Sequence, residues 1–383
     1  MRPSAMEYFD NLIPENMVKI KERKEQGENV VGYYCVFTPV ELIEASGAIP
    51  VGLCATKHDP IPAAERDLPR NLCPLIKSSY GFGITDKCPF FYFSDMIMAE
   101  TTCDGKKKMY EMLQELKPMM VLDIPNSSDF ELKHNHWVHE LNRAKKYLEE
   151  QFDTQVDNES LQTAIRAHNQ ERNKLMELVR LNKHDPAPLS GQDLMKVIWA
   201  RQFQLDREEY LNKIQDIIDE TVEHLNSQEY ADSNDENRPR ILVTGSPTGV
   251  GQEKVMNIIE QQGGQVILQE ACSGVKGLIK NIPEDKEPLA AIAEKYMELP
   301  CSCLSPNNGR FELITSLVDD YSIDGVIDIT LQACHTYNIE SKMLKDTLQE
   351  EKSIPLLQIE TDYTDTDVEQ IRLRVDSFLE MLG

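Results

Sequence analysis

The chain has 383 residues, 40% of them hydrophobic, and a formal net charge of -25 at pH 7. The length predicts two or three domains. The negative charge argues against nonspecific binding to nucleic acid or to an anionic membrane, because both need a basic surface. No apolar run approaches the roughly 20 residues that span a bilayer, and the N-terminus has no signal-peptide core, so we expect a cytoplasmic protein.

The first part of the chain alternates short apolar runs with helical patterns, which is typical of a mostly parallel α/β sheet. An opening helix is predicted near residues 17–26, and a helix with a glycine stop at 38–47. Two more helices should follow Cys73 and Cys103. The predicted strands are the apolar runs 29–34, 49–53, the run before Cys103, and 119–124.

The middle of the chain, from about residue 129 to 226, has helical spacing of apolar residues and no strand pattern. The amphipathic stripe is clearest at 210–225, and such stripes are usually core, so we expect a helical scaffold without chemistry. The polar, acidic segment 227–240 has the composition of a linker.

A second α/β unit follows the linker. The sequence predicts two Rossmann/flavodoxin-like parallel-sheet domains, at 1–128 and 239–383, joined by a helical segment at 129–238. The strands of the second unit are expected at 240–244, 265–269, 326–331 and 355–360, and its helices at 253–262, 289–297, 311–321, 339–348 and 368–382.

Nine cysteines are many for an intracellular chain. Their odd number and wide spacing argue against a disulfide framework, and the lack of any CxxC pair argues against a zinc ribbon. Any one of them is most simply a small buried hydrophobe. That explanation weakens when several occupy the same kind of position in the fold.

Three cysteines share a position where a helix is about to begin. Cys103 and Cys334 follow apolar strand-like runs, and Cys73 precedes Pro74, a residue favoured at the first helical position. Unpaired backbone N–H groups and the helix dipole there favour a thiolate. Three such thiolates can converge on one edge of a sheet, which suits an iron–sulfur cluster.

Further cysteines follow predicted strands, where open α/β sheets place their sites. These are Cys35, Cys54 and Cys272, while Cys303 lies in a loop and Cys88 has no such context, so we interpret it as structural. The glycine-containing loop 245–251 lacks the lysine and hydroxyl ending of a phosphate-binding loop, so a tight turn or a loop beside the cleft is expected.

Candidate proton-transfer groups are few. His335 directly follows Cys334 and could donate a proton or a hydrogen bond to cluster sulfur, although a plain helix-start histidine explains it equally well. Glu41 and Glu360 could act as acid or base near the cleft, but no local pattern singles them out.

The segments NLCPLIKS (71–78), ETTCDGKK (100–107) and LQACH (331–335) resemble the cluster motifs of the 2-hydroxyacyl-CoA dehydratase and benzoyl-CoA reductase superfamily. The resemblance covers nearly the whole chain and is closest to the double-cubane cluster proteins. It implies an [8Fe–9S] double-cubane cluster on six cysteines of one subunit. Cys73, Cys103 and Cys334 match the first triplet; for the second we choose Cys35, Cys272 and Cys303, with Cys54 and Cys301 in reserve.

The resemblance also implies a partner. A separate homodimeric ATPase with its own [4Fe–4S] cluster would inject electrons by ATP hydrolysis, and the protein, itself a homodimer, would reduce small unsaturated molecules. Two other readings stay open: a 2-hydroxyacyl-CoA dehydratase subunit with one [4Fe–4S] cluster, and a non-catalytic electron carrier or metal-binding protein.

Overall fold

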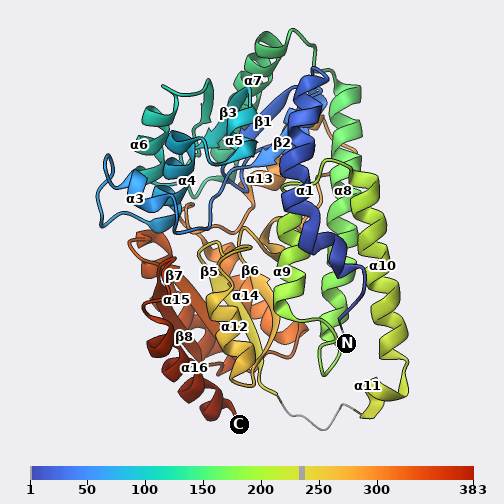
Figure 1. The fold of residues 1–383 in the computed structure, drawn as a ribbon, viewed down its shortest axis with the longest axis vertical. Helices are drawn as coiled ribbons and strands as arrows, with labels where there is room; N and C mark the ends of the chain where they lie inside the picture. Colours follow the sequence, from blue (N-terminus) through green and yellow to red (C-terminus); the bar gives the residue numbers. More distant parts are fainter. Residues whose placement is uncertain (1, 233–237) are drawn as a thin grey trace.

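The computed structural model describes residues 2–232 and 238–383 and contains two parallel sheets of four strands (Figure 1). The first sheet has the order β2-β1-β3-β4 and the second β6-β5-β7-β8, so both have the same layout and confirm the predicted fold class. Their strands are β1 (Val30–Tyr33), β2 (Ile49–Gly52), β3 (Met96–Glu100), β4 (Met119–Leu122), β5 (Arg240–Gly245), β6 (Gln265–Glu270), β7 (Gly325–Leu331) and β8 (Leu356–Thr361).

Most strand residues are buried, as expected for parallel strands covered by helices. Every residue of β3, β5, β6 and β7 is buried. In each sheet the chain begins at a central strand, moves to one neighbour, and returns to the other side. The loops after β1 and β3, and after β5 and β7, therefore lie where the strand order reverses, which is where such sheets bind ligands.

Helices cover both sheets and fill the middle of the chain (Figure 1). None of the described helices is apolar enough over sufficient length to cross a membrane. The helices are α1 (Met6–Glu25), α2 (Val40–Ala45), α3 (Ile61–Ala64), α4 (Pro74–Thr85), α5 (Pro89–Phe93), α6 (Asp104–Leu113), α7 (Phe130–Phe152), α8 (Asn158–Arg180), α9 (Gly191–Ala200), α10 (Arg207–Leu225), α11 (Gln228–Asp232), α12 (Lys254–Gln261), α13 (Pro288–Met297), α14 (Asn308–Asp320), α15 (His335–Lys352) and α16 (Val368–Leu382).

Three helices begin at least three residues earlier than the sequence predicted. The opening helix begins at Met6 and contains Pro14 rather than starting near residue 17. Burial of Met6, Phe9 and Leu12 on one face supports this first half despite the proline. Likewise α14 begins at Asn308 and not at residue 311, and α15 begins at His335, directly after Cys334, and not at residue 339.

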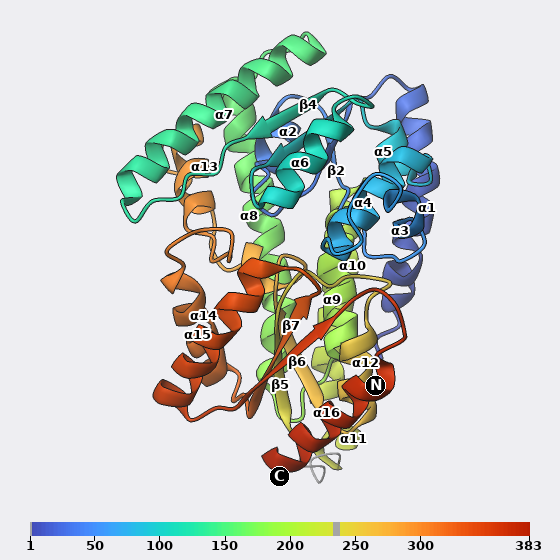
Figure 2. The same ribbon diagram turned by 90° about the vertical axis from the view of Figure 1, so that its left-hand side faces the viewer.

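The middle of the chain is helical, as predicted: 129–226, all of it described, contains no strand. Helix α13, from the second α/β unit, packs beside α7 and α8 (Figure 2). Its residues Ile292 and Tyr296 belong to the same hydrophobic cluster as Val31 and Met98 of the first sheet. The two units thus share core, and the boundaries at 128 and 238 stay a prediction.

Helix α8 connects the two sheets. Near its middle it contacts α2, which follows β1. Just beyond its end, Asn182 donates a hydrogen bond to the carbonyl of Ile267 on β6 at 2.9 Å, and its own carbonyl accepts one from Arg240 on β5 at 2.9 Å. One continuous helix therefore links the neighbourhood of β1 to the strands of the second sheet.

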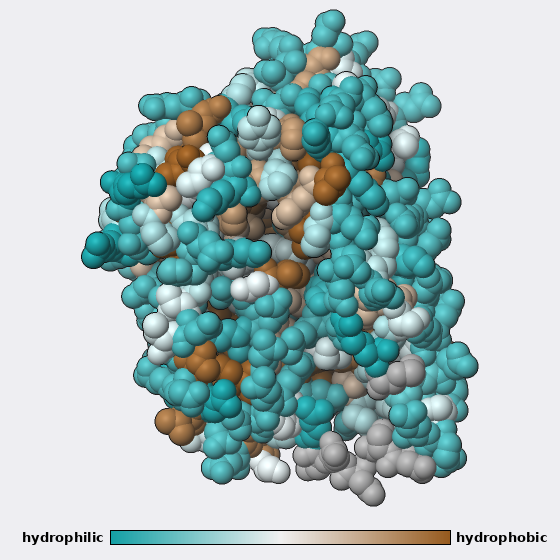
Figure 3. All heavy atoms as spheres, viewed as in Figure 1, coloured by the Kyte–Doolittle hydropathy of each residue, from teal (hydrophilic) through white to brown (hydrophobic). Residues whose placement is uncertain are grey.

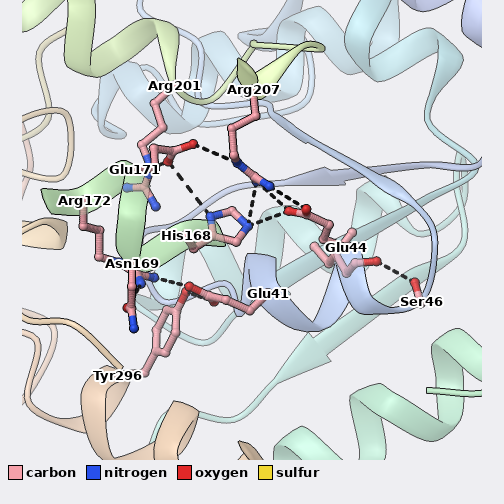
Figure 4. A network of polar contacts seen from close by, with 11 residues as sticks. Glu41, Glu44, Ser46, His168, Asn169, Glu171, Arg172, Arg201, Arg207 and Tyr296 are labelled. Carbon is pink, nitrogen blue, oxygen red and sulfur yellow. Dashed lines mark hydrogen bonds and ion pairs between the residues drawn. The ribbon is translucent and has the colours of Figure 1, made fainter. Parts of the chain in front are cut away.

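A buried polar network joins α8 to α2 and α13 (Figure 4). Arg172 on α8 pairs with Glu41 on α2, both fully buried, and Tyr296 on α13 donates to Glu41 at 2.8 Å. Arg172 also donates to Asn169 at 2.8 Å. Burial opposes ionisation of Glu41, but Arg172 outweighs it and holds the pKa of that carboxyl well below its usual range.

Arg172→Met should therefore lower the free energy of unfolding by about 3–5 kcal/mol, because it leaves the Glu41 carboxylate buried without its partner. Urea denaturation of the metal-free chain measures this change. Arg166→Met, at an exposed position of the same helix, is the matched control and should cost under about 0.5 kcal/mol. Equal stability of the two variants would contradict a structural role for the pair.

Candidate functional site

The structure brings Cys73, Cys103 and Cys334 together. Each lies immediately before a helix, α4, α6 or α15, and Pro74 opens α4 as the sequence predicted. The charges of the three sulfurs are close enough to interact: Cys73 with both others, and Cys334 with Cys103. Because Cys334 comes from the second α/β unit, this first group spans the cleft between the two sheets.

A second group contains Cys35, Cys272, Cys301 and Cys303. The sulfur of Cys301 lies within hydrogen-bond reach of the Cys272 and Cys303 thiols, and Cys35 interacts electrostatically with the other three. The three cysteines chosen from the sequence for a second triplet are thus neighbours. Cys301, which the sequence left in reserve, lies among them.

The remaining two cysteines are placed differently. The Cys54 thiol donates to the carbonyl of Tyr34 at 2.7 Å. Cys88 directly precedes Pro89, the first residue of α5, just as Cys73 precedes Pro74 of α4; this shared arrangement was not predicted from the sequence. Its side chain packs against the core of the first sheet, and no interaction with either cysteine group is seen for it among the described residues.

At Cys73 and Cys334, burial outweighs the effect of the helix N-terminus on the thiol pKa in the metal-free chain. It raises the pKa of Cys73 to about 12, although the backbone N–H groups of Leu75 and Ile76 work in the opposite direction. It raises the pKa of Cys35 and Cys334 as well. At Cys73 and Cys334 the expected stabilisation of a thiolate by the helix N-terminus is therefore outweighed, and a metal would have to displace their thiol protons.

Two buried lysines supply positive charge beside the cysteines. Lys106 interacts electrostatically with Cys35, Cys54 and Cys103, and so lies near both groups, and it donates to the Tyr34 carbonyl at 3.1 Å. Lys276 interacts electrostatically with Cys272 and Cys301, and forms an ion pair with Glu270 at 3.1 Å. Neither lysine was predicted from the sequence; the one available signal was the placement of Lys106 one helical turn after Cys103.

Glu100, the last residue of β3, is a fully buried carboxyl near Cys35 and Cys54. One of its oxygens accepts a hydrogen bond from the Thr38 hydroxyl, and the other has no partner within the described parts of the chain. Burial raises its pKa to about 7. Glu100 is therefore suited to hold and release a proton beside the cysteines at neutral pH.

The acid–base candidates from the sequence lie elsewhere. His335 is the exposed first residue of α15, next to Cys334, and makes no hydrogen bond or ion pair with the residues that the structure describes. Glu41 belongs to the buried network and stays ionised, which suits positioning better than proton transfer. Glu360 is exposed on β8. Their catalytic roles stay predictions.

The loop 245–251 packs beside the first cysteine group, one of the two alternatives that the sequence left open. The Ser246 hydroxyl accepts from the backbone N–H of Leu331 at 3.1 Å and reaches the Cys334 sulfur. Gly245 has a φ of +109° and lies so close to the Ile329 carbonyl that a Cβ there would be only 2.2 Å from its oxygen. Glycine is thus required for this close approach.

A cavity of about 70 Å³ lies at the cleft between the two sheets, where Figure 3 shows the surface hollowed among hydrophobic residues. No three His, Cys, Asp or Glu side chains of the described segments are spaced to hold a single metal ion. A cluster of several irons is wider than one ion, and buried thiols with nearby cations fit such a group. The cavity lining includes Cys35, Cys54, Cys272, Lys106, Tyr34 and Thr38.

The free energy of unfolding of the Glu100→Gln variant, relative to that of the natural chain, should increase as the pH rises. The folded carboxyl binds its proton more tightly than the unfolded one, so the natural chain loses up to about 3 kcal/mol of stability as pH rises from 4.5 through about 7. The neutral amide removes this loss. Urea denaturation of the metal-free protein across this range measures it. The exposed control Glu350→Gln should show no such trend, and a flat difference for Glu100→Gln would contradict the buried, protonated carboxyl.

Comparison with known proteins places this site in a family. The chain is 42% identical over 380 residues to YjiM of Escherichia coli K12, named as a candidate dehydratase subunit, covering 99% of this chain and 98% of that one. It is 22% identical to the (R)-phenyllactyl-CoA dehydratase beta subunit of Clostridium sporogenes, covering 97% and 96% of the two chains, and 18% identical to one of the subunits of the benzoyl-CoA reductase of Thauera aromatica, covering 94% and 92%. Residues 35–382 match the family described as 2-hydroxyglutaryl-CoA dehydratase, D-component, and the chain belongs to that family.

Proposed function

We propose that the protein is an iron–sulfur reductase that carries an [8Fe–9S] double-cubane cluster between its two sheets. The observation that carries the proposal is the gathering of seven cysteines into two groups that each draw on both α/β units. One [4Fe–4S] cluster on three thiolates would leave the cysteines of the second group without a role as ligands. Two neighbouring groups, one of three and one of four cysteines, would give each cubane its three ligands.

The ligands proposed for the first cubane are Cys73, Cys103 and Cys334. For the second they are Cys35, Cys272 and Cys303. Cys301 competes for one of these three positions, since its sulfur lies within hydrogen-bond reach of Cys272 and Cys303. Cys54 is the weaker candidate because its thiol is engaged with the Tyr34 carbonyl.

Such a cluster would supply low-potential electrons to a small unsaturated molecule. Lys106 and Lys276 would offset the negative charge of the thiolates and bound sulfide, since a buried charge needs a partner. Reduction of a triple to a double bond consumes two electrons and two protons. Glu100 would pass protons from solvent to the cavity, and the electrons would come from a partner.

That partner is proposed to be an ATP-dependent iron–sulfur activator. The loop after β5 lacks the lysine and hydroxyl ending that holds nucleotide phosphates, so ATP chemistry is assigned to a second protein. With a formal charge of -25, the chain would present an acidic surface to a basic patch on the activator. We further propose that the protein works as a homodimer.

The family favours a second candidate, a 2-hydroxyacyl-CoA dehydratase subunit. In that case Cys73, Cys103 and Cys334 would hold one [4Fe–4S] cluster, and the second cysteine group would have no metal. A non-catalytic electron carrier is the third possibility. Iron content separates these functions before any substrate is known.

Anaerobically reconstituted protein should contain about eight irons per chain. Cys303→Ala should lower this toward about four, and Cys334→Ala should lose cluster iron and all reductase activity while staying folded. The matched control is Cys88→Ala, which changes a cysteine outside both groups and should keep its iron. About four irons in the natural protein would favour the dehydratase; zinc or no metal would favour the third possibility. If Cys303→Ala kept about eight irons per chain, Cys301 and not Cys303 would be the third ligand of the second cubane.

Reduction of a small alkyne should require both the activator and ATP. Moderate salt should slow turnover, because screening weakens the attraction between the acidic chain and its partner. The assay compares the iron-loaded protein alone, with activator, and with activator plus ATP, across a salt series. ATP-driven reduction by the chain alone would overturn the division of labour, whereas salt-independent turnover would remove only the acidic docking surface.

A further inference from the structure

A second, larger pocket of about 370 Å³ lies beside α2 and the start of β2, against α8 and the turn between α9 and α10. This volume is within the range of roughly 300–1,000 Å³ usual for small-ligand sites. We call this pocket the vestibule. Its polar lining consists chiefly of Glu44, His168, Glu171, Arg201, Gln204 and Arg207.

The vestibule adjoins the cysteine-lined cavity. Tyr33, Val40 and Arg201 are the three residues that line both. Tyr33 is the last residue of β1, two positions before Cys35, and Val40 is the first residue of α2. These three residues therefore border both the larger pocket and the cavity that contains Cys35, Cys54 and Cys272.

Most of the vestibule's charges are already paired. Arg207 donates two hydrogen bonds to the Glu44 carboxylate, both at 2.6 Å, and His168 lies 2.7 Å from the same carboxylate (Figure 4). Glu171 lies between Arg201 and Arg207. These residues form a fixed, nearly neutral wall, because each buried charge has an opposite partner.

Arg201 is less fully hydrogen-bonded than the other charged residues of the vestibule. Its Nε donates to Glu171, but neither terminal nitrogen has a hydrogen-bond partner among the residues that the structure describes. The guanidinium also extends toward the loop that carries Cys272: a Cβ at Gly277 would lie 3.9 Å from Nη1. Arg201 thus presents free donors where the two hollows meet, in the geometry that binds a carboxylate or carbonyl oxygen.

We propose that the vestibule is the access route of the substrate to the cysteine-lined cavity, that Tyr33 and Val40 set its width, and that Arg201 selects small molecules with a carboxylate or carbonyl group. The identity of the entering molecule as the substrate rests on the proposed function. The route itself does not, because it is a property of the metal-free chain.

The test is alkylation of the full metal-free chain by iodoacetamide, with the rate at each cysteine followed by peptide mass spectrometry. Gln204→Trp places a larger side chain in the vestibule, and should slow labelling of Cys35 and Cys54 about threefold or more by blocking reagent access. Labelling of Cys334, which does not line the cavity, should not change. Gln349→Trp, on the exposed face of α15, is the matched control.

Slowing of less than about threefold in a folded Gln204→Trp protein would overturn the route and assign access to the open cleft of Figure 3. If the Gln204→Trp variant does not fold, Leu205→Trp is used instead, because Leu205 also lines the vestibule. These results stand whether or not the chain binds iron, so failure of the route is distinguishable from failure of the proposed function.

Arg201→Gln tests selection by charge. The quantity measured is the rate of Cys35 labelling by anionic iodoacetate divided by its rate with neutral iodoacetamide. This ratio should be about threefold or more higher in the natural chain than in the variant, because the guanidinium attracts the carboxylate. Arg207 remains as a partner for Glu171, which keeps the fold. Arg201→Lys should restore part of the preference. An unchanged ratio in Arg201→Gln would overturn the selective role of Arg201.

Discussion

The loops at the carboxyl ends of the two parallel sheets face one another, and the candidate site depends on this arrangement. Cys103 after β3 meets Cys334 after β7, and Cys35 after β1 meets Cys272 after β6. The Thr56 hydroxyl in the loop after β2 donates to the Val250 carbonyl in the loop after β5 at 2.9 Å. Both sheets have the same strand order, and the loops at their two switch points meet at one cleft.

The cleft combines groups that oppose each other electrostatically. Burial keeps Cys35 and Cys73 protonated, while Lys106 and Lys276 stay charged in the same environment. Lys276 is paired with Glu270, but Lys106 forms no ion pair with the residues that the structure describes, and a cation without a nearby anion is costly in a protein interior. Negatively charged metal–thiolate ligation would remove the imbalance, so the proposed cluster would stabilise the folded chain at the same time as it provides reactivity.

Part of this site could be predicted from sequence because it depends on local pattern. Strand ends, the proline after Cys73 and the helix after Cys103 are visible in neighbouring residues, and they identified the first cysteine group. Tertiary placement is not visible in that way. Cys301 lies among the second group because a loop folds back, and Lys106 is hidden in a run of lysines whose other members, Lys107 and Lys108, are exposed.

The same limit applies to the fold. The alternation of strands and helices predicted both sheets, since the period of apolar residues is local. It did not reveal that α13 would leave its own unit and complete the core beside α7. It also could not show that Arg201 and Glu171 would meet Tyr33 and Val40, because these contacts join residues far apart along the chain.

Helix α8 has a consequence for how this chain can vary. Between Arg172, fixed to α2, and Asn182, fixed to β6, there is no loop to absorb a change of length. One inserted residue there would shift the second sheet by about 1.5 Å and turn it by about 100° relative to the first. The cysteines of the two halves would no longer oppose each other. Surface loops can accept insertions, but the length of this helix cannot change, because it sets the distance and the rotation between the two sheets.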